Sequence, residues 1–143
     1  MSTPDPLRVF LDANILFSAS LKEEHRFLQF WTTRNLIPMT SPCVADETGR
    51  NCVSRVHSAR FARLLERTHL VSDIPGAFLP RGIVLPAKDA PVLAAAVFGG
   101  ADYLITGDKH HFRKWMNTPI QTHLGLLLIQ EPAQFLDEHL DPL

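Results

Sequence analysis

Four acidic side chains stand at positions where folding alone does not require a carboxylate. They are Asp12, Glu47, Asp89 and Asp108. Asp12 and Asp108 follow apolar segments that are typical of buried strands, and open α/β sheets bind ligands beyond the carboxyl ends of their strands. Carboxylates that converge repel one another, and a hard cation offsets that repulsion. The pattern therefore predicts an acidic pocket for a magnesium-type ion, and hence phosphate chemistry.

Each of the four residues also has an ordinary structural explanation. Asp12 and Asp89 stand just before expected helices, where an aspartate caps free backbone N–H groups. Asp108 follows a Thr-Gly pair in a turn, where aspartate is common. Glu47 lies within an expected helix and could be an ordinary solvated residue. The joint arrangement of two strand ends, one helix start and one helix face is what favours a shared site.

Two polar residues lie close to the aspartates that end strands. Asn14 comes two residues after Asp12, and Thr106 comes two residues before Asp108. The amide or the hydroxyl could hold a carboxylate or a water in place, although a hydrogen bond within a turn explains each residue equally well. One or two magnesium-type ions held there could activate a water and stabilise the leaving oxygen of a phosphodiester.

The elements that must position these residues alternate between strands and helices. We expect strands at residues 7–11, 36–40, 103–106 and 126–129, with a short extended piece at 83–85. We expect helices at residues 14–20, 23–34, 42–56, 58–69, 89–98 and 132–140, with a short helical piece near 112–116. This order is typical of a doubly wound α/β sheet, in which right-handed crossovers bring the ends of the first and fourth strands to a common edge.

The bulk composition limits the partners and the location of the protein. The 143 residues suit a single domain over residues 1–143, and 45% of them are hydrophobic. The net charge of −1 gives no global attraction to nucleic acid, so any such binding needs a local patch or a metal. The two cysteines form no disulfide framework, and no signal-peptide pattern or membrane-spanning apolar run is present. We therefore expect a cytoplasmic protein without membrane contact.

Four segments together resemble a known family. They are LDANILFSA, SPCVADETGRN, KDAPVLAAAVFGGADYLITGDKHHF and GLLLIQEPAQFL. The chain from about Arg8 to Phe135 resembles PIN-domain proteins, and in particular the VapC-type toxin ribonucleases. The resemblance implies a PIN-like three-layer α/β sandwich, with a central and mainly parallel sheet of about five strands flanked by helices.

The resemblance also implies an activity and a site. It implies a metal-dependent endoribonuclease that cleaves single-stranded RNA, with Mg²⁺ or Mn²⁺ as cofactor and a 5′-phosphate as product. Asp12, Glu47, Asp89 and Asp108 would be the catalytic and metal-binding residues, supported by Asn14 and Thr106. Glu47 departs from the family pattern, because Thr-Gly follows it where an aliphatic or basic residue is more usual. A VapC-type toxin acts with an antitoxin protein, which makes such a partner an expectation here.

Basic residues near the acids could contact RNA. Arg50 follows Glu47, and Lys109 and Arg113 follow Asp108. A further group shares one helix face and consists of Arg60, Arg63 and Arg67. Either group could guide a phosphate backbone, and either could be a solvated face. His110 and His111 are adjacent, and adjacent histidines rarely share a zinc site without further spaced ligands.

Other functions compete with ribonuclease activity. A haloacid-dehalogenase-type phosphatase needs Asp-x-Asp after its first strand, and this chain has Asp-Ala-Asn from Asp12. A receiver domain needs an adjacent acidic pair near the first strand, which the sequence lacks. The remaining alternative is a non-catalytic PIN-like module that binds RNA or a protein. Apolar residues within 23–31 and 58–70 also leave a homodimer open.

Overall fold

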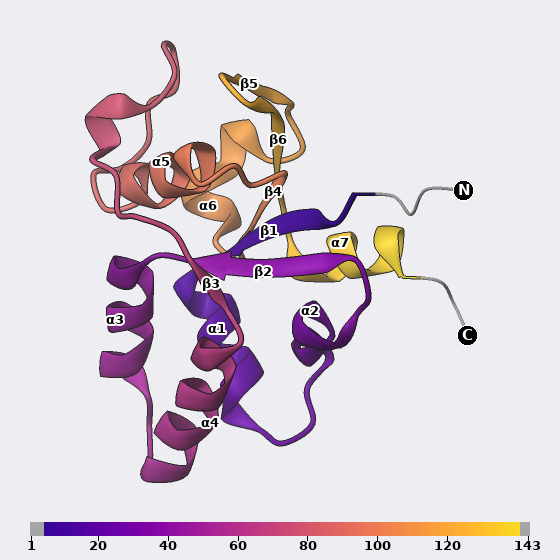
Figure 1. Ribbon diagram of the computed structural model, residues 1–143. Helices are drawn as coiled ribbons and strands as arrows, with labels where there is room; N and C mark the ends of the chain where they lie inside the picture. Colours follow the sequence, from indigo (N-terminus) through magenta and orange to yellow (C-terminus); the bar gives the residue numbers. More distant parts are fainter. Residues whose placement is uncertain (1–4, 141–143) are drawn as a thin grey trace.

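Six strands form one sheet in the computed structural model of the protein, which describes residues 5–140 (Figure 1). Their order is β3-β2-β1-β4-β6-β5, and all neighbours are parallel except the β5–β6 hairpin. The strands are β1 Leu7–Leu11, β2 Leu36–Thr40, β3 His69–Leu70, β4 Tyr103–Ile105, β5 Ile120–Thr122 and β6 Gly125–Gln130. The mainly parallel sheet is as predicted, but β3 and β5 are short strands that we did not expect, and the piece expected at residues 83–85 is not a strand.

Residues 1–4 and 141–143 lie outside the described residues. They include part of the N-terminal segment in which we expected no signal peptide, and both ends of the expected domain 1–143. Within residues 5–140, no helix is both long enough and apolar enough to cross a membrane.

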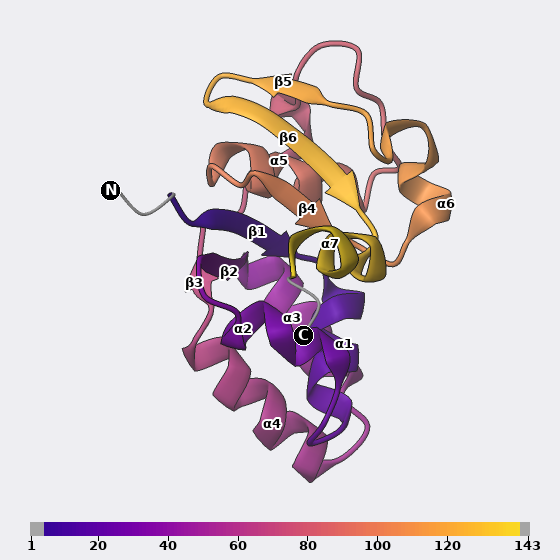
Figure 2. The same cartoon turned by 90° about the vertical axis from the view of Figure 1, so that its right-hand side faces the viewer.

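Helices cover both faces of the sheet, as Figure 2 shows from a second direction. One face carries α1 Ala13–Leu21, the 3-10 turn η1 Arg26–Leu28, α2 Gln29–Thr32, α3 Pro42–Asn51 and α4 Arg55–Glu66. α7 Pro132–His139 packs against α2 through the stacked rings of Phe30 and Phe135, whose centroids are 5.7 Å apart. η2 Gly76–Phe78 and α5 Ala90–Phe98 lie on the opposite face, and α6 Lys109–Phe112 and the 3-10 turn η3 Arg113–Trp115 follow β4. The arrangement is the expected three-layer α/β sandwich.

β1 lies at the centre of the sheet and of the core. Val9, Phe10 and Leu11 are fully buried, because β2 and β4 flank β1 and helices cover both faces. The register pairs Leu11 of β1 with Ile105 of β4. The predicted meeting of the strands expected at 7–11 and 103–106 is therefore confirmed, and the loops that follow them emerge at the same edge of the sheet.

The helix predicted over residues 42–56 is wrong after Asn51, because two helices meet there. α3 ends at Asn51, and α4 begins at Arg55. Ser54 Oγ accepts a hydrogen bond from the backbone N–H of His57 at 3.1 Å, and His57 Nδ1 accepts one from the backbone N–H of Val53 at 3.1 Å. These reciprocal bonds satisfy N–H groups that a new helix leaves free, and so they fix its start.

Three other predicted elements differ from the structure. Residues 23–34 form η1 and the four-residue α2 in place of one long helix, and His25 Nδ1 caps η1 by accepting from the N–H of Phe27 at 3.1 Å. The helix predicted at 58–69 spans Arg55–Glu66, because residues 69 and 70 pair with β2. Residues 83–85 lie in a loop and join none of the six strands described.

Candidate metal centre

Asp12 lies where β1 passes into α1, and its two carboxylate oxygens have different partners. Oδ1 accepts a hydrogen bond from the backbone N–H of Ala13 at 2.8 Å, which caps α1. Oδ2 accepts one from the hydroxyl of Thr106, also at 2.8 Å. Asp12 is only 8% exposed. It therefore has the capping role that an ordinary explanation predicts and also contacts the loop after β4.

The hydroxyl of Thr106 joins three segments of the chain. Besides donating to Asp12, it accepts hydrogen bonds from the backbone N–H of Asp108 at 3.0 Å and from Asn14 Nδ2 at 3.4 Å. Asn14 Oδ1 in turn accepts from the backbone N–H of Gly107 at 2.9 Å. A Cβ atom at residue 107 would lie 3.3 Å from Asn14 Oδ1, so the glycine permits this close approach. The network fixes the loops after β1 and β4 relative to each other.

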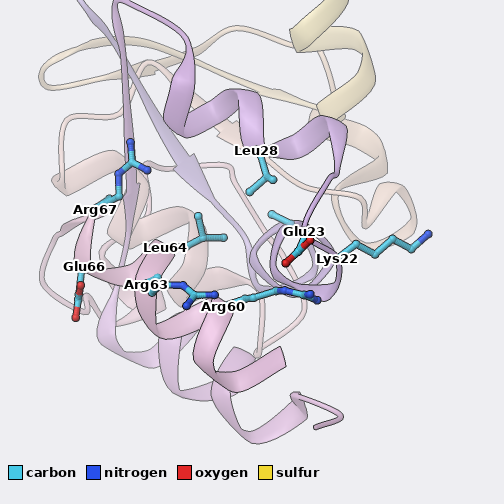
Figure 3. Close-up of a pocket in the computed structure, with 9 residues that line it drawn as sticks. Lys22, Glu23, Leu28, Arg60, Arg63, Leu64, Glu66 and Arg67 are labelled. Atoms are coloured by element: carbon cyan, nitrogen blue, oxygen red, sulfur yellow. The ribbon is translucent and has the colours of Figure 1, made fainter. Parts of the chain in front are cut away.

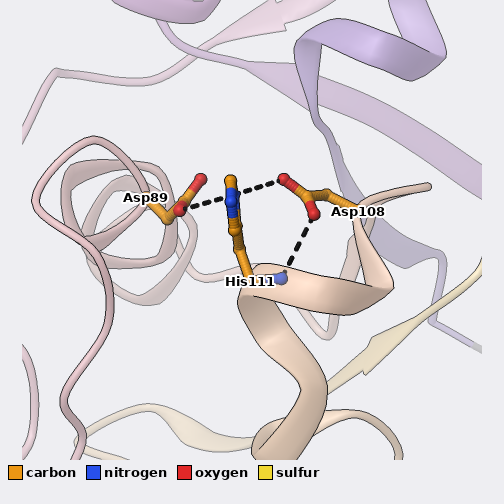
Figure 4. Close-up of side chains that lie close together, drawn as sticks. All are labelled: Asp89, Asp108 and His111. Atoms are coloured by element: carbon orange, nitrogen blue, oxygen red, sulfur yellow. Dashed lines mark hydrogen bonds and ion pairs between the residues drawn. The ribbon is translucent and has the colours of Figure 1, made fainter.

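Asp89, Asp108 and His111 come together beside this network (Figure 4). Asp108 caps α6, because its Oδ1 accepts a hydrogen bond from the backbone N–H of His111 at 3.2 Å. Asp89 occupies the N-cap position of α5, yet its side chain makes no capping hydrogen bond within the described chain. His111 Nδ1 lies 2.6 Å from Asp108 Oδ2 and 3.1 Å from Asp89 Oδ2. Asp89 is 6% exposed and presents its carboxylate to the site rather than to its own helix.

Sequence reasoning missed His111. The two adjacent histidines have different neighbours, and His110 Nδ1 lies 2.9 Å from Arg113 Nη2. His111 alone joins the two aspartates. Its position three residues after Asp108 is the available signal, since residues three apart in a helical turn lie on one face.

Glu47 approaches the aspartates from α3. It is exposed and lines a groove of about 560 Å³ with Arg50 and Lys88. The negative charge of Glu47 raises the pKa of both Asp12 and Asp89, so the side chain lies within electrostatic reach of both. The structure thus brings all four acidic residues into one region, with Glu47 at its solvent side.

Burial has the largest effect on the pKa of the two innermost carboxylates. It raises the pKa of Asp12 against the opposing hydrogen bonds from Thr106 and Ala13. Burial also raises the pKa of Asp89, while the nearby His111 charge lowers it and Asp108 raises it. The carboxylates of this region supply the oxygen ligands that a divalent cation prefers, and such an ion would offset their mutual repulsion.

The basic residues that we expected to contact RNA lie on several different surfaces of the protein. Arg50 lines the groove beside Glu47. Lys109 Nζ pairs with Glu131 Oε1 at 3.1 Å, which offsets part of its charge. Arg113 contacts His110 on the exposed side of α6.

A second basic group lines a separate cavity of about 390 Å³ (Figure 3). Its positive side chains are Lys22, Arg60, Arg63 and Arg67. Arg60 Nη1 donates to the carbonyl oxygen of Leu21 at 2.9 Å, at the end of α1 opposite to Asp12. This group therefore lies at a distance from the candidate metal centre.

The model of the PIN-domain family matches residues 8–110, which is most of the chain. The chain belongs to the PIN-domain family. All four acidic residues of this PIN-domain protein lie within the matched segment, whereas His111 directly follows it. Comparison with curated proteins gives no match.

Two solved structures resemble this PIN-domain protein in fold. One is VapBC2 from Rickettsia felis, bound to a DNA fragment from its promoter. The sequence identity is 14% and the TM-score is 0.63, and the match covers 87% of this chain and 98% of the other. The other is VapC20 from Mycobacterium tuberculosis, a sarcin-ricin loop cleaving toxin, at 21% identity and a TM-score of 0.51, covering 70% of this chain and 91% of the other. At these identities the likeness shows a shared fold.

Proposed function

We propose that this PIN-domain protein is a metal-dependent endoribonuclease that cleaves single-stranded RNA. The observation that carries the proposal is the convergence of Asp12, Asp89 and Asp108 where β1 and β4 end, with Glu47 beside them. Such a convergence destabilises the folded protein unless a cation offsets the repulsion. A site of this kind at the carboxyl edge of a parallel sheet supports phosphate chemistry.

The four acidic side chains have distinct places in this proposal. Asp12, Asp89 and Asp108 would hold Mg²⁺ or Mn²⁺ directly, and Glu47 would complete the site from its exposed side. When bound, the ion would lower the pKa of a bound water and offset charge on the leaving oxygen. Thr106 and Asn14 keep the loops of Asp12 and Asp108 in one geometry through the hydrogen bonds described above. In-line attack on phosphorus would leave a 5′-phosphate and a 3′-hydroxyl.

The groove beside Glu47 supports a single RNA strand as substrate. Arg50 and Lys88 supply positive charge, while Pro75 and Pro91 are among its apolar lining residues. Cationic side chains position a phosphate backbone without reading its sequence. Lys109 of α6 and Arg113 of η3 follow Asp108 in the chain and would contact the backbone on the other side of that residue.

An antitoxin is the proposed protein partner, which makes this chain the toxin of a type II pair. A basic side chain of the antitoxin would enter the acidic region and pair with its carboxylates. The partner should be encoded by the adjacent reading frame, and it should co-purify with the wild-type protein. Unchanged binding to a variant carrying Asp12→Asn and Asp108→Asn would show that the partner docks elsewhere.

The cellular location and the oligomeric state complete the proposal. Cys43 and Cys52 are free, which favours the reducing cytoplasm. The apolar residues that suggested a homodimer, including Phe30, Trp31 and Phe61, are buried in the core of this chain. Light scattering at micromolar concentration tests a dimer against the monomer mass of 16.1 kDa.

Cleavage of labelled single-stranded RNA by the purified protein tests the main proposal. We expect cleavage with Mg²⁺ or Mn²⁺, none with EDTA, and a loss of several orders of magnitude in Asp12→Asn and Asp108→Asn. Glu47→Gln should lose activity, while Asp46→Asn, an exposed neighbour on the same helix, serves as the matched control. RNA binding without cleavage under all these conditions would favour the non-catalytic module instead.

A further inference from the structure

The imidazole ring of His111 lies between two carboxylates from different helices (Figure 4). Its Nδ1 atom is 2.6 Å from Asp108 Oδ2 and 3.1 Å from Asp89 Oδ2. One ligand atom from each of the three residues lies within 4.8 Å of the others. The set therefore mixes a nitrogen donor with oxygen donors, unlike the purely acidic group that the sequence predicts.

Two features of α6 hold the ring in this place. The backbone N–H of His111 donates to Asp108 Oδ1 at 3.2 Å, which sets the two side chains on one face of the first turn. Phe112, the next residue, is fully buried and anchors α6 to the core. The ring itself is 28% exposed at its side chain. The structure of α6 therefore fixes the position of the ring.

Asp89 supplies an independent sign that a ligand belongs here. Asp89 Oδ2 is buried and has no aligned hydrogen-bond partner among residues 5–140, and its approach to His111 Nδ1 is an ion-pair contact without that alignment. A buried carboxylate oxygen without a hydrogen bond is unfavourable in a folded protein. A cation bound by this oxygen would remove the deficit.

The geometry points to His111 as an additional protein ligand, next to Asp89 and Asp108, for the divalent ion of the proposed nuclease. Ligands ~2.1 Å from an octahedral ion and at right angles to each other stand ~3 Å apart. The distances from Nδ1 to the two carboxylates, 2.6 Å and 3.1 Å, lie close to that separation. The inference rests on the metal site of the proposed function, and it assigns this site a nitrogen ligand.

The nitrogen donor has a consequence for metal selectivity. Mg²⁺ prefers oxygen ligands, whereas imidazole favours first-row transition ions, whose affinities rise from Mn²⁺ through Co²⁺. His111 therefore shifts the site away from Mg²⁺ and toward transition ions. A carboxamide in place of the imidazole would offer oxygen near the position of Nδ1 and should reverse that shift.

Metal titration of the full-length protein without RNA tests the inference. Isothermal titration calorimetry gives the affinities for Co²⁺ and Mg²⁺ of the wild type, His111→Asn and His110→Asn. We expect His111→Asn to lower the ratio of Co²⁺ to Mg²⁺ affinity by about tenfold or more. His110→Asn should keep the wild-type ratio, because His110 contacts Arg113 outside the cluster. An unchanged ratio in folded His111→Asn would overturn the inference.

A second measurement does not depend on the variant folding. Proton NMR of the wild type follows the ring signals of the seven histidines during Co²⁺ addition. Of the seven histidine rings, we expect that of His111 to show the largest paramagnetic shift. Co²⁺ binding that leaves the His111 ring unshifted would contradict the assignment. Because no RNA is present, a protein that binds Co²⁺ through His111 but cleaves nothing would refute only the proposed function.

Discussion

The hydroxyl of Thr106 donates a hydrogen bond to Asp12 Oδ2 at 2.8 Å, although the two residues are 94 positions apart in the sequence. The contact exists because β1 and β4 are neighbours, so the residues after them meet at one edge. It gives the buried carboxylate a donor and fixes its orientation. The candidate metal centre thus depends on the central strand pair of the sheet.

The first prediction concerns this contact. Thr106→Val removes the donor to Asp12 and the acceptor for Asp108 and Asn14, and Thr106 is fully buried. Loss of a buried hydrogen bond leaves its partners unsatisfied, so we expect the free energy of unfolding to fall by about 1–3 kcal/mol. Metal affinity should fall about tenfold or more. Denaturant unfolding and metal titration measure both, and Thr106→Ser, which keeps the hydroxyl, is the control. Equal losses in the two variants would show that the hydroxyl is unimportant.

The second prediction concerns the charge of Asp12 in the absence of metal. Burial raises the pKa of Asp12 in the folded protein, so the folded state binds its proton more readily than the unfolded state does. Stability therefore falls as pH rises from the ordinary value of 3.8 through the raised folded pKa, so the penalty is present at neutral pH.

Asp12→Asn removes this penalty and should raise the melting temperature in EDTA, by about 3 °C for each kcal/mol. Mg²⁺ should stabilise the wild type more than the variant, since a ligand stabilises the state that binds it. Thermal unfolding with EDTA or with Mg²⁺ measures both effects. A variant that melts below the wild type in EDTA would mean that the carboxylate stabilises the metal-free fold.

The four acidic residues could be nominated from the sequence, whereas the contact of His111 with Asp89 could not. Asp12 and Asp108 follow strands whose apolar character is local, and the α/β order determines that β1 and β4 lie together. His111 contacts Asp89 only because α5 and α6 approach each other. No local sequence pattern indicates how close these two helices lie. The break between α3 and α4 depends on His57 Nδ1 reaching the N–H of Val53, which helix propensity does not describe.

Pro38 shows a second limit of prediction from the sequence. It lies within β2, inside the sheet, although proline cannot donate a ladder hydrogen bond. β3 pairs with β2 only at Met39 and Thr40. In the described structure, Pro38 therefore has β1 on one side and no strand on the β3 side. The short length of β3, which the sequence does not reveal, makes the proline tolerable there.

The third prediction concerns His57, which joins α4 to α1. Its Nδ1 accepts from Val53, so the ring proton resides on Nε2, which lies 3.0 Å from the carbonyl oxygen of Phe17. His57→Phe keeps a ring but leaves the partner groups unpaired, and we expect a loss of about 2–4 kcal/mol in unfolding free energy. Denaturant unfolding measures the loss. His69→Phe, at an exposed position, should change stability much less, and similar losses in both would argue against the buried hydrogen bonds as the cause.

The fourth prediction concerns pH and His25. Burial, followed by the charge of Lys22, lowers the pKa of His25 below its ordinary value of 6.5. The unfolded chain therefore binds the proton first, so stability falls as pH drops through about 6.5 and stops falling below the folded pKa. Protonation would also remove the Nδ1 acceptor that caps η1.

Asn is a good capping residue that does not titrate, so His25→Asn should keep the cap and lose this component of the pH dependence. Melting temperatures between pH 5 and 8 for the wild type and His25→Asn measure the difference. Parallel pH profiles for the two proteins would contradict the assignment.

The position of β4 in the sheet has a consequence for synthesis on the ribosome. β4 inserts between β1 and β6, and the last acidic residue of the candidate centre, Asp108, directly follows its loop. A nascent chain that ends before β4 carries Asp12, Glu47 and Asp89 but lacks the strand that orients Asp12. Non-local pairings of this kind form late, after the intervening chain has emerged. Under the proposed function, an incomplete polypeptide is therefore inert toward cellular RNA, and a premature stop codon upstream of residue 103 should abolish the proposed toxicity in a growing cell.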